Sequence, residues 1–123
     1  MLNTFKKTLV EAYYYIMIAD GLVDPRELSF GSLMIEKEGI TREDFEKELD
    51  EMSITDVDVI TQNLRESMLA LTKEQQLKIV AYMVKIADAD GTKDPSEMTS
   101  IQRVMEGLEL HINDIIKMKQ QLF

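Results

Sequence analysis

The sequence predicts an all-α fold, a compact seven-helix bundle with two three-helix halves related by a pseudo-twofold axis. Apolar residues recur at helical spacing along almost the whole chain, and no sustained period-two alternation typical of β-strands is found. Helix-start and glycine-stop signals divide this pattern into segments of ordinary helix length. One eight-residue motif also occurs twice, 70 residues apart, which indicates that the two halves repeat one arrangement.

The length of 123 residues suits one domain. We therefore expect residues 1–123 to form a single helical domain. Its half-repeats are expected at about 4–52 and 72–123, linked by a helix at about 55–71.

The first half contains three predicted helices with clear boundaries. Asp24 and Thr41 are good N-cap residues, Pro25 suits a first helical position, and Gly39 is a typical residue just after a helix. The predicted ranges are about 4–19, 24–38 and 41–52. The residues expected to face the core are Phe5, Leu9, Ala12, Tyr13, Ile16, Met17, Leu28, Phe30, Leu33, Met34, Phe45, Leu49 and Met52.

The linking helix and the second half follow the same rules. Thr72 to Gln75 form a capping box, Asp94 is an N-cap residue and Gly107 ends the helix that Asp94 begins. The predicted ranges are about 55–71, 72–87, 94–106 and 109–123. The expected core residues are Val57, Ile60, Leu64, Met68, Leu71, Leu77, Val80, Ala81, Val84, Ala87, Met98, Ile101, Val104, Met105, Ile112, Ile115, Ile116 and Leu122.

The repeated motif reads D-G-x-x-D-P-x-E, at residues 20–27 and again at 90–97. One interpretation is helix capping, since Asp, Pro and Glu stand where a capping box needs them. The other is a divalent-cation site, because oxygen-rich loops favour Ca²⁺ or Mg²⁺ over zinc or copper. The candidate metal ligands are Asp20, Asp24, Glu27, Asp88, Asp90, Asp94 and Glu97. No other cofactor is expected.

With these paired motifs the chain resembles the TerB-like (tellurite-resistance) family. The resemblance extends from about Leu9 to the last predicted helix. It implies an all-α domain whose acidic residues cluster on one side, where divalent-cation binding has been proposed. It also implies a role in bacterial stress responses, including resistance to toxic oxyanions, often as an interaction module.

The charge of the chain bears on its partners. The formal net charge is −9, with 23 acidic against 14 basic residues. The helix predicted at 41–52 has a strongly acidic outer face, which we expect to be solvated, formed by Glu43, Asp44, Glu46, Glu48, Asp50 and Glu51. Such a surface repels phosphate backbones, so we expect no nucleic-acid binding and favour a basic protein as partner. The chain has no cysteine and no apolar stretch of membrane-spanning length, and we expect a cytoplasmic protein without direct membrane insertion.

Catalytic motifs are missing from the sequence. It contains no nucleophile elbow, no phosphate-binding glycine loop and no H-E-x-x-H helix. Together with what the family resemblance implies, we expect a non-enzymatic, divalent-cation-binding interaction domain in a cytoplasmic stress response of the tellurite-resistance type. The alternative is a metal-free helical scaffold or adaptor whose motif acids serve only as helix caps.

Overall fold

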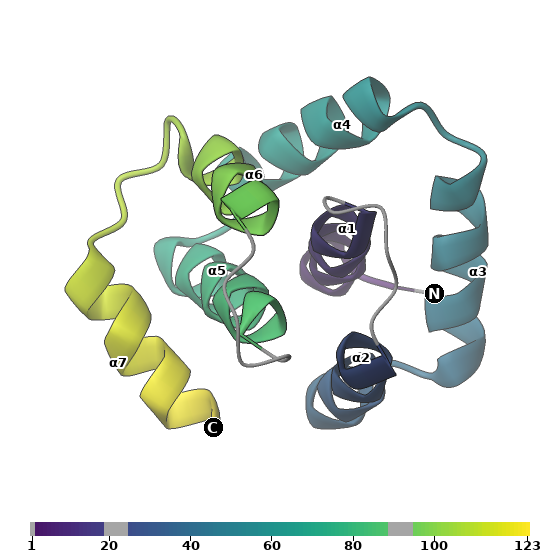
Figure 1. The fold of residues 1–123 in the computed structure, drawn as a ribbon, viewed down its shortest axis with the longest axis horizontal. Coiled ribbons are helices and arrows are strands. Elements are labelled where there is room, and N and C mark those ends of the chain that lie inside the picture. Colours follow the sequence, from purple (N-terminus) through teal and green to yellow (C-terminus); the bar gives the residue numbers. More distant parts are fainter. Residues whose placement is uncertain (1, 19–24, 89–94) are drawn as a thin grey trace.

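In the computed structural model, seven α-helices and no strand make up the regular structure of the described residues (Figure 1). The structure describes residues 2–18, 25–88 and 95–123, of which 25–27 and 95–98 are described by their backbone alone. The helices are α1 (Thr4–Ile18), α2 (Pro25–Glu38), α3 (Arg42–Ser53), α4 (Val57–Ala70), α5 (Lys73–Ala87), α6 (Pro95–Met105) and α7 (Ile112–Leu122). None of these helices is long and apolar enough to cross a membrane.

The helices are arranged around a central pair, α1 and α5, which pack against each other. Helices α2 and α6 each contact both members of this pair, while α3 packs on α1 and α7 packs on α5. Helix α4 crosses one side of the molecule and contacts α1 and α6 (Figure 1). The predicted all-α bundle is confirmed, and the pseudo-twofold relation of its halves stays a prediction.

The central position of α1 explains how much of it is buried. Residues 8–13 are buried without interruption, and so are residues 15–17. A helix that other helices surround must be apolar on nearly every side, because almost none of its surface faces water. Glu11 belongs to this buried run and is only 6% exposed.

The predicted caps are confirmed wherever the structure describes them. Thr72 Oγ1 accepts a hydrogen bond from the Gln75 backbone N–H at 3.2 Å, and Gln75 Oε1 accepts one from the Thr72 N–H at 3.1 Å. Thr41 caps α3 by accepting from the Asp44 N–H at 3.1 Å. The capping box at Thr72 thus satisfies two backbone donors that a helix start leaves free.

Two glycines end helices as the sequence predicts. Gly39 follows α2 with φ +69°, and Gly107 follows α6 with φ +84°. Side chains are disfavoured in this left-handed region because Cβ approaches the following carbonyl oxygen. Glycine therefore suits both helix ends.

The prediction of the inward face of α2 was partly wrong. Phe30 and Met34 are buried as expected, but Leu28 is 50% and Leu33 43% exposed, and Ile35 is buried instead. Helix α2 lies at the edge of the bundle (Figure 1), so only one narrow side of it reaches the core. Which leucines fall on that side depends on the packing angle, which the sequence does not give.

The start of α7 was also placed too early. The helix begins at Ile112, after the N-cap residue His111, and not near Glu109. Leu108 and Leu110 pack against the core from the connection that precedes the helix, which explains their apolar character without a helix. Ile115 is buried, whereas Ile112 is 71% and Ile116 47% exposed, so the predicted apolar stripe is wrong at these two positions.

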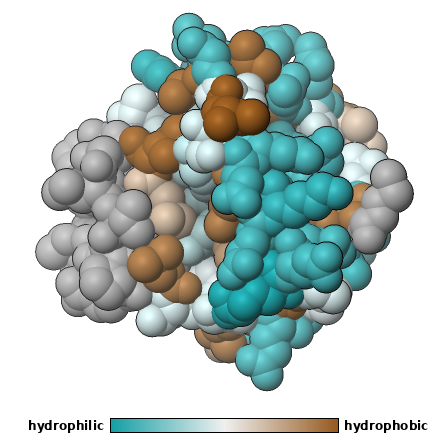
Figure 2. Space-filling view, turned by 90° about the vertical axis from the view of Figure 1, so that its right-hand side faces the viewer, coloured by the Kyte–Doolittle hydropathy of each residue, from teal (hydrophilic) through white to brown (hydrophobic). Residues whose placement is uncertain are grey.

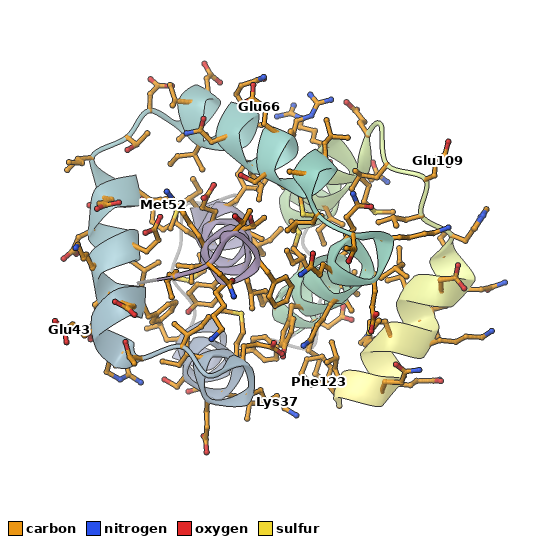
Figure 3. All side chains as sticks on the ribbon, turned by 180° about the vertical axis from the view of Figure 1, so that it is seen from behind. Lys37, Glu43, Met52, Glu66, Glu109 and Phe123 are labelled. Carbon is orange, nitrogen blue, oxygen red and sulfur yellow. The ribbon has the colours of Figure 1, made fainter. Side chains whose placement is uncertain are left out.

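Polar and aromatic contacts join α2 to α5 and to the end of α7. Glu38 Oε1 accepts a hydrogen bond from Lys78 Nζ at 2.7 Å, and Glu38 Oε2 accepts one from the Tyr82 hydroxyl at 2.5 Å. Burial and the Glu38 carboxylate raise the pKa of Tyr82 above its ordinary value. The Phe123 ring lies 5.5 Å from that of Tyr82 and 5.6 Å from that of Phe30, next to Lys37 (Figure 3).

Candidate functional site

The predicted acidic ligands fall mainly on segments that the structure does not describe. Glu27 and Glu97 belong to the first turns of α2 and α6, and their side chains are not described. The predicted ligands that lie wholly outside the described residues are Asp20, Asp24, Asp90 and Asp94. Among the side chains that are described, no three acidic or histidine residues are grouped so as to hold a metal ion.

Asp88 is the one predicted ligand whose side chain is described. It is the C-cap residue of α5, and its Oδ2 accepts a hydrogen bond from Lys119 Nζ of α7 at 3.0 Å. The two side chains are 25% and 33% exposed, so this ion pair is partly shielded from water. A cation at Asp88 would therefore have to compete with Lys119 for one carboxylate oxygen.

The helix ends that flank the two acidic segments lie on one face of the bundle. In Figure 1 the last turns of α1 and α5 and the first turns of α2 and α6 all point toward the viewer. The carboxyl ends of α1 and α5 carry partial negative charge, whereas the amino ends of α2 and α6 carry partial positive charge, so the helix dipoles at this face oppose one another.

A second candidate site is a pocket of about 510 Å³ between α1, α3 and α4. We call it the Glu11 pocket; Figure 3 shows Met52 projecting from α3 toward α1 and Glu66 on α4. Its lining residues are Thr4, Lys7, Thr8, Glu11, Glu48, Glu51, Met52, Thr55, Ile60, Asn63, Glu66 and Ser67. The lining carries four carboxylates and one ammonium group.

Glu11 is the unusual member of this lining. Its carboxylate is buried, and no hydrogen bond or ion pair joins it to any other residue that the structure describes. Burial raises its pKa from 4.5 to about 7; the charge of Lys7 opposes this rise, and that of Glu48 adds to it. Near neutral pH, the carboxyl group of Glu11 is therefore protonated in part of the molecules and ionised in the rest.

Lys7 does not neutralise the pocket. Its Nζ lies 4.0 Å from Glu48 Oε1, and the Lys7 side chain is 55% exposed whereas that of Glu48 is 14% exposed. Burial raises the pKa of Glu48 as well, and Glu51 contributes to the rise. Glu48 was expected on the solvated acidic face of its helix, and that expectation was wrong.

The sequence carries one signal for the burial of Glu11. From Leu9 to Met17 every residue except Glu11 is apolar or aromatic, which is the pattern of a buried helix. A carboxylate within such a pattern indicates that the acidic side chain is itself buried and does not merely interrupt the apolar stretch.

Comparison with known proteins supports one family. The model of the family described as tellurite resistance protein TerB matches residues 36–120. This span includes Asp88 and the second acidic motif but not the first. No curated protein and no solved structure matches the chain.

Proposed function

The chain belongs to the TerB family of tellurite resistance proteins, and from this membership we propose a non-enzymatic domain that binds a divalent cation. It acts through protein contacts in a cytoplasmic stress response. The cation is Ca²⁺ or Mg²⁺, held by oxygen atoms of the two acidic motifs and of the neighbouring Asp88; the ligands come from Asp20, Asp24, Glu27, Asp88, Asp90, Asp94 and Glu97.

The observation that carries this proposal is the common face of four helix ends. The first turns of α2 and α6 and the last turns of α1 and α5 point to the same side of the bundle (Figure 1). The helix ends that adjoin motifs 70 residues apart in the chain thus lie on one side of the bundle, which supports a cation site shared between the two motifs. A ligand set made up only of oxygen atoms suits hard divalent cations such as Ca²⁺ and Mg²⁺.

The second candidate is a metal-free scaffold, and Asp88 favours it. The ion pair of Asp88 with Lys119 links the end of α5 to α7 and gives this carboxylate a structural role. In that case Asp24 and Asp94 cap their helices and nothing more.

The partner surface we propose is the outer face of α3. Figure 2 shows a hydrophilic band along this side of the molecule, and its exposed acids include Glu43, Glu46, Asp50 and Glu51. A basic protein surface complements this charge, whereas nucleic acid is repelled.

Thermal melts of the wild type and of an Asp24→Asn/Asp94→Asn variant test the cation. Asn caps a helix about as well as Asp, so both helix starts should persist. A cation at 100 times its dissociation constant stabilises the folded state by about 2.7 kcal/mol. For the wild type, we expect a rise in Tm of roughly 10 °C in millimolar Ca²⁺ or Mg²⁺ relative to chelator. The double variant should lose most of this rise.

The matched control is Asp56→Asn. Asp56 caps α4 by accepting a hydrogen bond from the Asp58 N–H at 2.8 Å, and it lies outside both motifs. Its variant should keep the full cation response. No metal-induced rise in the wild type would leave the scaffold as the surviving function.

A further inference from the structure

We propose that the Glu11 pocket binds an alkylammonium group, of the kind carried by free polyamines and by lysine side chains. This site is separate from the acidic motifs and does not depend on the cation proposed there. It is formed by α1, α3 and α4.

The first argument is the buried carboxylate. Glu11 is 6% exposed, and within the described chain it has neither a hydrogen-bond donor nor an ion-pair partner. Burying a charge without a partner costs free energy. Buried polar groups that lack a partner are rare in proteins, so each one calls for an explanation. A cationic ligand in the pocket supplies the missing partner.

The second argument is that the pocket is rich in acceptors. The hydroxyl of Thr8 donates to the Thr4 carbonyl at 2.6 Å, and that of Thr55 donates to the Glu51 carbonyl at 2.7 Å. Since their protons are engaged, these hydroxyls offer only acceptor lone pairs to a ligand. An ammonium group has three donors and no acceptor, so it complements such a lining.

The third argument separates an organic cation from a metal ion. The described acids of the pocket do not converge as a metal requires. They are distributed over Glu11 on α1, Glu48 and Glu51 on α3, and Glu66 on α4. A volume of about 510 Å³ has room for a methylene chain. The apolar walls formed by Met52 and Ile60 suit that chain, as the stems of lysine side chains lie on apolar surfaces.

Binding of an ammonium group should release protons, and this release can be measured. Near neutral pH, Glu11 is protonated in part of the molecules. Ammonium binding favours its ionised form, so binding releases protons. The charged groups that face it are Lys7 on its own helix, Glu48 and Glu51 on α3, and Glu66 on α4. Lys7 favours the ionised form of Glu11 and Glu48 opposes it, so a bound cation adds to the effect of Lys7.

Isothermal titration calorimetry at pH 7 and 150 mM NaCl tests the proposal, with spermidine and N-acetyl-lysine amide as separate probes. We expect saturable binding of at least one probe, with proton release that shows as a dependence of the heat on the buffer. Glu11→Gln should weaken binding at least tenfold and abolish the proton release. Binding of spermidine alone assigns the site to polyamines, and binding of both assigns it to the ammonium group itself.

The matched control is Glu36→Gln, because Glu36 is exposed on α2 and does not line the pocket. It should bind as the wild type does. Glu66→Gln, at an exposed position of the lining, should weaken binding about threefold. Because Glu66 is exposed, this variant should disturb folding less than Glu11→Gln. Absence of binding by both probes, or equal loss in Glu36→Gln and Glu11→Gln, overturns the proposal. So does Ca²⁺ or Mg²⁺ binding that Glu11→Gln removes.

Discussion

Replacing Glu11 by Gln should change how the stability of the protein depends on pH. In the folded state the pKa of Glu11 is about 7, against 4.5 for an ordinary glutamate. Between these values the folded protein holds a proton that the unfolded chain has released. Stability is therefore lost as pH rises through this window.

The magnitude follows from the same two values. One pH unit of difference in pKa corresponds to about 1.36 kcal/mol, so the interval from 4.5 to about 7 amounts to about 3 kcal/mol. Gln has no such titration. The free energy of unfolding of Glu11→Gln, relative to the wild type, should thus rise by about 3 kcal/mol between pH 4.5 and pH 8. Any fixed cost of burying the amide is the same at every pH and cancels from this difference.

Urea unfolding at pH 4.5, 5.5, 6.5 and 8, followed by circular dichroism, measures this difference. Glu36→Gln serves as the control, since Glu36 is exposed and its variant should follow the wild-type curve. A constant offset between Glu11→Gln and the wild type across the whole range would refute the reasoning, because Glu11 would then titrate as an exposed glutamate does.

Three further predictions concern packing, capping and the ion pair at the end of α5. Gly31→Ala should lower the stability by about 1–3 kcal/mol despite the better helix propensity of Ala, because a Cβ there lies 2.5 Å from the hydroxyl oxygen of buried Tyr13; an unchanged Tm would contradict this overlap. Thr72→Ala should cost about 1 kcal/mol in urea unfolding with an unchanged m-value, and Thr72→Ser should restore most of it. Lys119→Gln should raise the Ca²⁺ affinity in titration calorimetry if Asp88 is a ligand, since Lys119 Nζ now occupies its Oδ2. Unchanged affinity would remove Asp88 from the ligand set.

The sequence predicted helix boundaries well wherever they depend on local chemistry. Thr41 and Thr72 accept hydrogen bonds from backbone groups three residues away, and Gly39 and Gly107 need only their own backbone angle. Such features are written within a few neighbouring residues. They therefore require no knowledge of the tertiary structure.

Burial could not be predicted equally well, because it depends on which helices surround a given helix. Leu28 and Leu33 are exposed although both are large apolar residues, since α2 lies at the edge. Glu11 is buried although it is a carboxylate, since α1 lies at the centre. The acidic motifs were found by their repetition, and their role as metal ligands stays a prediction. The Glu11 pocket draws residues from three helices and has no sequence motif.

The contact between α1 and α5 has a consequence for how the molecule opens. Helix α1 is buried along most of its length and α5 mainly over its second half, and each is contacted by both α2 and α6. Their backbone amides can meet solvent only when the whole assembly comes apart, so they should exchange hydrogen for deuterium at the slowest, global rate. Helices α3 and α7 each pack mainly on one central helix and should exchange earlier, through partial openings. Cutting the chain within α4 would leave α1 in one fragment and α5 in the other. Neither fragment by itself should then keep the slow hydrogen exchange of its central helix.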